Sequence, residues 1–155
     1  MDNNHEIFIQ FEDHLLTDHK PSVYFREIAD STWFLTTYPF SLLGDLKMIE
    51  QSPLHHPEGD VWEHTMLVVD TAAQARNISQ DSRVFMWSAL LHDLGKAQAT
   101  KVRKGKITAY DHDKLGAVLA ADFLKKFTDD RDFITKVSRM VRWHMQILFV
   151  VKKFP

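Results

Sequence analysis

The chain has 155 residues, of which 45% are hydrophobic and 26% charged, and its formal net charge at pH 7 is −2. These values are typical of one ordinary folded domain, and they exclude a disordered chain and a strongly basic nucleic-acid coat. The absence of cysteine excludes disulfides and thiolate metal sites, so a metal site would use carboxylates and the nine histidines. No apolar run approaches a membrane span and no secretory signal is recognisable, so we expect a cytoplasmic protein that does not contact membranes.

The five glycines and five prolines are few for an all-β protein, which needs many tight turns. Apolar residues instead recur at helical spacing, which predicts an all-α bundle with a loop at 51–59 and a loop or mini-hairpin near 97–110. The expected helices, in chain order, cover residues 6–17, 21–30, 41–50, 60–77, 83–94, 113–127 and 132–150. We expect the helices of residues 1–50 to pack on a core formed by residues 51–155, in a single structural unit.

Two of these helices carry signals at their ends. Asp60 is expected to cap the helix over 60–77, and Glu63, three residues later, to complete a pattern like a capping box. Gly95 is expected to end the helix over 83–94 at its C′ position. Because that helix is apolar on nearly all sides, we expect it to be central and buried.

A histidine and an aspartate, His92 and Asp93, lie at the C-terminal end of this buried helix. An ionised carboxylate there is costly unless it is paired or binds a metal, and the exposed helix carbonyls also favour a cation. A purely structural alternative is that Asp93 caps the helix end or pairs with Lys96, three residues later.

Three further histidines are placed to reach the same region. His64 and His144 belong to the apolar stripes of their helices, and both are therefore expected to face the core. His112 precedes a helix on the turn above Gly116, where a glycine permits close approach of another element. A single inward histidine is usually a satisfied core residue, but several on separate helices beside a His-Asp pair are typical of metal sites in helical bundles.

The other histidines and several carboxylates are less constrained by the pattern. The histidines expected on the surface are His5, His14 and His19. His56 is expected either to contact a substrate or to serve the structure of its loop. The carboxylates that could orient the imidazole rings are Glu63, Asp111 and Asp113.

The order of His64 followed by His92 and Asp93 resembles the signature of the HD superfamily of metal-dependent phosphohydrolases. The chain is more similar still to the HD region of bacterial CCA-adding tRNA nucleotidyltransferases, in order, over about residues 10–150. The segments that carry this similarity are QSPLHHPEGDVWEHTMLVVDTAA at 51–73, LLHDLGKAQAT at 90–100, ITAYDHDKLGAVLA at 107–120 and MVRWHM at 140–145. The nucleotidyltransferase head of that family, with a Gly-Ser loop followed by paired aspartates, has no counterpart in this sequence, so CCA addition is not expected.

The resemblance implies one or two divalent metal ions, of manganese, iron, nickel, cobalt, magnesium or zinc. The expected ligands are His64, His92, Asp93, His112 and His144. Asp93 is also expected to be catalytic, because a metal that it holds lowers the pKa of a bound water and supplies hydroxide near neutral pH. Two-metal HD enzymes take a final Asp from a later helix, and no Asp or Glu follows Asp132 here. A second metal is therefore expected to be held weakly.

The function that this resemblance implies is hydrolysis of a phosphate ester in a nucleotide, a 2′,3′-cyclic phosphate or an RNA end. Lys96 is expected to act in catalysis and to bind the phosphate together with His56 and Arg142. The segment from Lys96 to Lys106 holds five basic residues and no acidic one, which attracts nucleotide or RNA unless it is only a solvated loop. Two alternatives stay open. One is a non-catalytic module that binds metal and nucleotide or RNA, which the absent final Asp favours. The other is a di-iron oxygenase, against which the same absence counts.

Overall fold

The structure, a computed structural model, describes residues 3–143, and within that range it is helical apart from one small antiparallel sheet of two strands. The predicted all-α fold is confirmed. In chain order the elements are α1 (Asn3–Thr17), α2 (Ser22–Ile28), α3 (Thr32–Thr36), α4 (Ser41–Gly44), α5 (Val61–Ala75), the 3-10 turn η1 (Arg76–Ile78), α6 (Ser82–Leu91), α7 (Lys96–Ala99), β1 (Lys101–Arg103), β2 (Lys106–Thr108), α8 (His112–Lys125) and α9 (Arg131–Arg142). None of these helices is long and apolar enough to cross a membrane.

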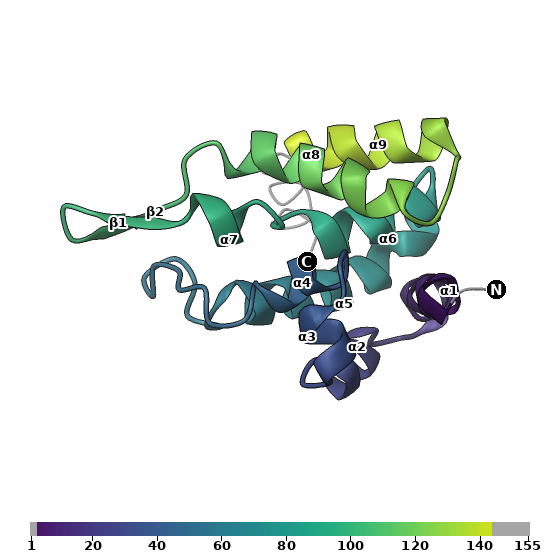
Figure 1. The fold of residues 1–155 in the computed structure, drawn as a ribbon, viewed down its shortest axis with the longest axis horizontal. Coiled ribbons are helices and arrows are strands. Elements are labelled where there is room, and N and C mark those ends of the chain that lie inside the picture. The colour runs from purple at the N-terminus through teal and green to yellow at the C-terminus, as the bar shows by residue number, and fades with distance from the viewer. Residues whose placement is uncertain (1–2, 144–155) are drawn as a thin grey trace.

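The bundle is assembled around α6, the helix that the sequence predicts to be buried. Seven of its ten residues are buried, so it presents apolar side chains in every direction. It packs against α1, α5 and α9, while α8 and α9 run side by side along one face of the molecule (Figure 1). The C-terminal end of α6, where the His-Asp pair lies, is therefore enclosed by several helices.

Aromatic rings hold the N-terminal helices on this core. Phe8 of α1 stacks on Trp87 of α6 and on Phe127, with ring centroids 4.8 Å apart in both contacts. Phe11 of α1 meets Phe25 of α2 edge-on at 5.0 Å. Such pairs contribute about 0.5–1.5 kcal/mol each beyond the apolar area that they bury, so α1 and α2 belong to the same packed core as α6.

The helix predicted over 41–50 is wrong beyond Gly44, and α3 is a short helix that the sequence analysis missed. Met48 has a left-handed φ of 71°, a conformation that an α-helix does not continue. The backbone N–H of Met48 donates to Oδ2 of Asp60 at 3.0 Å. The segment before the 51–59 loop is therefore held as a turn against the start of α5.

Asp60 caps α5 as predicted, but Glu63 does not complete a capping box. Asp60 Oδ1 accepts a hydrogen bond from the Glu63 backbone N–H at 2.9 Å. Both carboxylate oxygens of Glu63 instead accept from the guanidinium of Arg26, each at 2.8 Å. The contact between α2 and α5 brings this cation alongside, and its hydrogen bond is the main reason that the pKa of Glu63 is lowered.

Gly95 does not end α6, and the prediction of a C′ glycine is wrong. The helix ends at Leu91, and Gly95 has an ordinary φ of −68° and leads into α7. A glycine is needed here for space, because a Cβ at this position would lie 2.1 Å from the carbonyl oxygen of His112 and 2.8 Å from the backbone nitrogen of Gly116. The turn after α6 therefore touches the first turn of α8 backbone to backbone, which brings Asp93 and His112 together.

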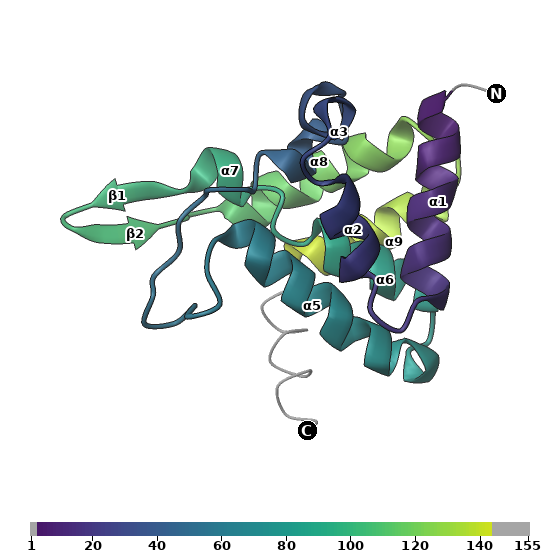
Figure 2. The ribbon, with the colours of Figure 1, turned by 90° about the horizontal axis from the view of Figure 1, so that it is seen from below.

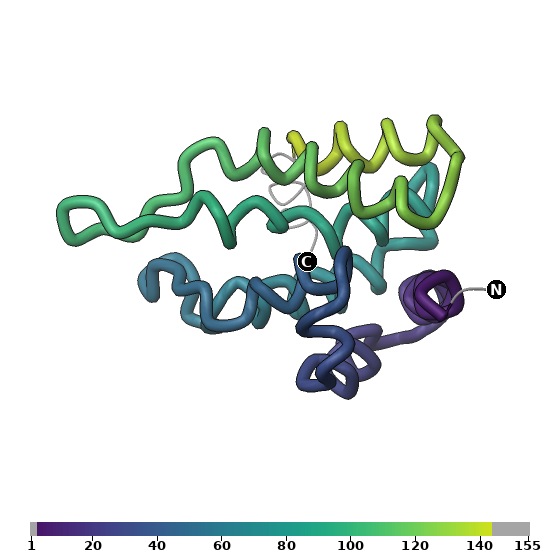
Figure 3. The backbone as a smooth tube through the Cα atoms, viewed as in Figure 1, coloured from purple at the N-terminus to yellow at the C-terminus, as the bar shows by residue number. Residues whose placement is uncertain are grey.

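The mini-hairpin predicted near 97–110 is present. β1 pairs with β2 in antiparallel register, and the turn residues Lys104 and Gly105 both have positive φ, as the tight hairpin turns require. The hairpin projects from the body of the molecule at the same end as the 51–59 loop (Figures 2 and 3). The short α7 connects it to the turn that carries Asp93.

The contact at Gly95 generates a stability prediction. Gly95→Ala is expected to lower the free energy of unfolding by about 3 kcal/mol, because the added Cβ meets backbone atoms that cannot move away independently. Gly44→Ala is the matched control. The Cβ that it adds would lie 3.1 Å from Cδ2 of Leu35, a flexible side chain, and its effect is expected to stay within about 1 kcal/mol. Denaturant unfolding of both variants measures the difference, and equal stabilities would refute the close-contact explanation.

Candidate metal centre

The carboxylate of Asp93 is the centre of the site. Its side chain is only 1% exposed, and four nitrogen atoms from different parts of the chain surround it. The distances to its oxygens are 3.1 Å from His92 Nε2, 3.7 Å from His64 Nε2, 3.7 Å from His112 Nε2 and 3.4 Å from Lys96 Nζ. These groups come from α5, the turn after α6, α7 and the start of α8, so the folded bundle brings them together.

Each of the three imidazole rings is fixed from its other nitrogen. Nδ1 of His92 hydrogen-bonds the Ala89 carbonyl at 2.7 Å, and Nδ1 of His112 hydrogen-bonds the Ala109 carbonyl at 2.8 Å. Because a carbonyl only accepts, each Nδ1 is the donor, and in the neutral ring the Nε2 lone pair points toward Asp93. Metal-binding histidines are typically held in this way, with one ring nitrogen donating a hydrogen bond to the protein and the other facing the metal.

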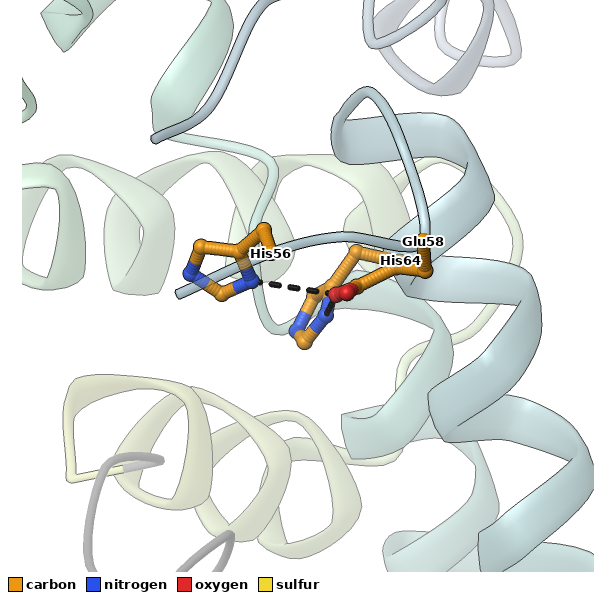
Figure 4. Close-up of side chains that lie close together, drawn as sticks. All are labelled: His56, Glu58 and His64. Carbon is orange, nitrogen blue, oxygen red and sulfur yellow. Dashed lines mark hydrogen bonds and ion pairs between the residues drawn. The ribbon is translucent and has the colours of Figure 1, made fainter. Parts of the chain in front are cut away.

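His64 is oriented by a carboxylate from the loop before its helix. Its Nδ1 lies 2.7 Å from Oε1 of Glu58, and Nδ1 of His56 lies 3.0 Å from the same oxygen (Figure 4). Burial is the largest influence on His64 and lowers its pKa from the ordinary value, against the opposing effect of Asp93. The ring is therefore neutral near pH 7, as a metal ligand must be.

Glu58 itself stays ionised over the whole physiological range. Partial burial is the largest single influence on its pKa and raises it. A backbone hydrogen bond and the hydrogen bonds from His56 and His64 together outweigh burial and lower the pKa to about 2. Glu58 is thus a charged anchor that ties the 51–59 loop to the first turn of α5. Ligand atoms of Glu58, His56 and His64 also lie close enough together to hold a cation, but the separations of 2.7 and 3.0 Å are those of direct hydrogen bonds.

Glu58, the carboxylate that orients His64, is not among the residues predicted for this role. The three predicted carboxylates are engaged elsewhere: Glu63 with Arg26, Asp111 with Lys114, and Asp113 with Arg142. Glu58 lies six positions before His64 in a Pro-bounded loop, and no helical periodicity relates the two. Its only signal was an acidic residue in the loop directly before a histidine-bearing helix.

The other predicted site residues are Lys96, His56, Arg142 and His144, and their surroundings differ. Lys96 contacts Asp93, as the structural alternative also required, and its Nζ donates to Oε1 of Gln51 at 2.7 Å. His56 is held by Glu58, while Arg142 pairs with Asp113 and lies 4.4 Å from the ring of Trp143. His144, a predicted ligand, lies outside the described residues.

The histidines expected on the surface are only partly so. His19 is exposed, but His5 and His14 are half-buried. The ring of His14 stacks on Tyr24, with centroids 3.8 Å apart, and its Nδ1 lies 2.7 Å from Asp18. Packing of α2 on α1 covers this ring, which is the reason the surface prediction fails for it.

The donor set around Asp93 fits a divalent metal. Ligand atoms of His64, His92 and Asp93 all lie within 4.8 Å of one another, and all three residues are buried. Neutral imidazole nitrogens and a carboxylate are both ligands of divalent metals, so a cation between them would be coordinated by both. Asp93 Oδ2 faces His64 and His92, while Oδ1 faces His112. The carboxylate is therefore oriented to serve two groups of nitrogen ligands at once.

A cavity of about 200 Å³ adjoins the centre on the side of the hairpin. Its walls come from the 51–59 loop with the residue before it, from α7 and its C-cap, and from β2 with the residue after it. Lys96 belongs both to this cavity and to the ring of groups around Asp93. A molecule in the cavity would therefore lie beside Lys96, which contacts the carboxylate of Asp93.

Comparison with known proteins agrees with this geometry. The family model described as HD domain matches residues 61–148. Similar curated proteins are the Multifunctional CCA protein of Actinobacillus pleuropneumoniae serotype 5b (strain L20), 29% identical over 136 residues, and that of Halorhodospira halophila (strain DSM 244 / SL1), 36% identical over 98 residues. These matches cover 85% and 63% of this chain but only 32% and 22% of the relatives, so the chain spans about a third or less of their length. No solved structure matches.

The site predicts that Asp93 is more important for metal binding than His112. Asp93→Ala is expected to weaken metal affinity by at least about 100-fold, because it removes the negative charge that faces all three imidazoles, and His112→Ala by about tenfold. Metal content of the two purified proteins, measured by inductively coupled plasma mass spectrometry, tests this order. Equal retention of metal in both variants would show that the carboxylate is not the central ligand.

The position of Glu58 generates a second prediction. Glu58→Gln keeps the size of the side chain but removes its charge, so it is expected to weaken metal affinity by roughly 10- to 100-fold. Competition with a chromophoric chelator measures that affinity, and Glu27→Gln, at an exposed position on α2, is the matched control. If both variants bind metal as tightly as the unchanged protein, Glu58 does not act through His64.

Proposed function

The chain belongs to the HD domain family, a superfamily of metal-dependent phosphohydrolases, and we propose that it hydrolyses a phosphate ester in a nucleotide, a 2′,3′-cyclic phosphate or an RNA end. The observation that carries this proposal is the set of three oriented imidazoles around the buried carboxylate of Asp93. A site of neutral histidines and one carboxylate keeps a net positive charge when it holds a divalent ion, which suits an anionic ester.

His64, His92 and Asp93 would hold the first ion, and His112 faces the second oxygen of Asp93, from which a second ion would also be reached. A bound divalent ion supplies hydroxide near neutral pH and polarises the phosphoryl oxygens. The imidazole-rich set favours iron, cobalt, nickel or zinc over magnesium, which prefers oxygen ligands. The protein's own contribution is to keep these rings oriented before any substrate arrives.

Lys96 is the residue proposed to contact the substrate phosphate. Its ammonium lies 3.4 Å from Asp93 and borders the cavity, so a phosphate at the edge of the metal centre comes within its reach. A positive group placed where negative charge develops lowers the barrier for its formation. Lys96 is therefore a catalytic residue in this proposal and not a metal ligand.

The hairpin supports a nucleic-acid substrate over a small phosphate ester. Its basic side chains are exposed, and the whole segment of residues 96–110 lacks an acidic residue. The guanidinium of Arg103 lies 5.1 Å from the ring of the exposed Tyr110, an arrangement that leaves a cation and an aromatic face open to solvent. Basic and aromatic groups together suit phosphate and base contacts with a single strand. The similarity to proteins named as CCA proteins is consistent with an RNA 3′ end.

The alternative of a non-catalytic binding module keeps the same residues in the same places. In that case His64, His92 and Asp93 bind a metal and the cavity binds nucleotide or RNA, but no ester bond is cleaved. Turnover is the property that separates the two functions, because both predict metal and ligand binding.

The hydrolase proposal predicts slow cleavage of bis-p-nitrophenyl phosphate or of a 2′,3′-cyclic nucleotide. A chelator is expected to abolish the activity, and manganese, cobalt or nickel to restore it. His92→Ala is expected to remove it together with the metal. Lys96→Ala is expected to lower kcat by about 100- to 1,000-fold with the metal retained, because it removes charge stabilisation and no ligand.

Lys125→Ala, at an exposed position near the end of α8, is the control and is expected to leave kcat unchanged. Absence of turnover with every metal, while metal content stays constant, would overturn the hydrolase proposal and favour the binding module.

A further inference from the structure

Gln51 is a buried amide next to the metal centre to which the mechanism above gives no role. It is 9% exposed and is the first residue of the 51–59 loop, which also carries Glu58. Its Oε1 accepts a hydrogen bond from Nζ of Lys96 at 2.7 Å. Because an ammonium only donates, the atom that faces Lys96 is the oxygen, and this fixes the orientation of the amide. The NH₂ group of Gln51 therefore points elsewhere.

Within residues 3–143 the Nε2 of Gln51 is buried and has no hydrogen-bond partner. Buried donors of this kind are rare in folded proteins, because each carries the desolvation penalty of the group without a compensating bond. Gln51 also borders the cavity beside the centre. A ligand in that cavity is thus the available source of an acceptor for this N–H.

The neighbouring cation determines which acceptor fits. Lys96 Nζ and Gln51 Nε2 belong to side chains that are already hydrogen-bonded to each other, and both residues line the same cavity. Two donors, one of them charged, favour an oxyanion over a neutral carbonyl. Because Lys96 also lies 3.4 Å from Asp93, an oxyanion bound here is adjacent to the metal ligands.

We infer that Gln51 and Lys96 form a phosphate-binding subsite, in which the Gln51 amide donates to a non-bridging oxygen of a phosphate group. The inference rests on the proposed function and deepens it, since it names a residue that binds the phosphate group of the substrate. Gln51 is a substrate-binding residue in two ways: its oxygen holds Lys96 in place, and its nitrogen contacts the ligand. The cavity of about 200 Å³ is smaller than the roughly 300–1,000 Å³ of sites that enclose a whole drug-sized ligand. It suits a phosphate with part of its sugar, and the rest of a strand would lie outside along the hairpin.

A double variant separates ligand binding from a merely structural role. Gln51→Glu keeps an oxygen acceptor for Lys96 but replaces the amide donor with a charge that repels phosphate. Gln51→Leu removes both the acceptor and the donor. If Gln51 served only to hold Lys96, adding Gln51→Leu to a protein that already carries Lys96→Ala would cause no further loss of phosphate affinity.

The test uses the full chain loaded with manganese and titrated with inorganic phosphate by isothermal calorimetry. Gln51→Glu and Gln51→Leu are each expected to weaken phosphate binding by at least about tenfold, with metal content and Tm unchanged. Gln98→Leu, at an exposed glutamine on α7, is the matched control and is expected to bind phosphate normally. A further loss of phosphate affinity is also expected when Gln51→Leu is added to Lys96→Ala. An affinity that does not change on that addition would overturn the inference, and so would equal binding in all variants or no phosphate binding by the unchanged protein.

This outcome is independent of turnover. If phosphate binding depends on Gln51 but no ester is cleaved, the hydrolase proposal fails and the subsite stands. Repeating the titration with cytidine 3′-monophosphate and with a hexaribonucleotide of the same 3′ end distinguishes the sources of the phosphate. A strand that contacts the basic hairpin is expected to bind more tightly than the mononucleotide and to lose this advantage as salt increases.

Discussion

A buried negative charge on Asp93 is the constraint on which the architecture of the site depends. A carboxylate that is 1% exposed is unfavourable unless cations or hydrogen-bond donors surround it. Lys96 of α7 supplies one cation, and a metal ion held by the imidazole nitrogens from α5, α8 and the turn between α6 and α7 would supply the other positive charge. The helices must therefore approach closely at that turn, and the absence of a side chain at Gly95 makes the approach possible.

The same constraint explains why Nδ1 of each imidazole ring is hydrogen-bonded to the protein. A neutral imidazole that faced Asp93 without an anchor could rotate and present its N–H to the carboxylate, which would satisfy the charge without any metal. The carbonyls of Ala89 and Ala109 and the carboxylate of Glu58 engage the three Nδ1 atoms. This orientation directs Nε2 of each ring toward Asp93, as coordination of a cation there requires. The 51–59 loop is thus part of the metal centre, through Glu58, as well as a wall of the adjacent cavity.

The part of the site that lies on helices could be predicted from the sequence. His64 lies on an apolar stripe and His92 and Asp93 at the end of a buried helix, so helical periodicity and burial predicted that they face the core. The resemblance to the HD superfamily implied that they share one metal site. Glu58 and Gln51 lie in or beside an irregular loop, where no period relates position in sequence to position in space. Their roles depend on how the loop folds back onto α5 and α7, which only the tertiary structure determines.

The two failed signals at helix ends have the same origin. Glu63 had the right spacing for a capping box, but Arg26, 37 residues earlier in the chain, offers its carboxylate a charged partner. Gly95 had the right position for a helix terminator, but its role is to make room for the backbone of α8. Local patterns predicted the elements themselves well, and long-range contacts decided what individual residues do at their ends.

The claim that Asp93 organises a metal centre is tested most directly by locating the metal. A crystal of the protein grown with manganese, with anomalous diffraction data collected near the manganese edge, would reveal the position and number of bound ions. The account predicts an anomalous peak coordinated by Nε2 of His64, Nε2 of His92 and a carboxylate oxygen of Asp93. It would be contradicted by a map without a peak at Asp93, or by a peak held only by His56, Glu58 and Nδ1 of His64.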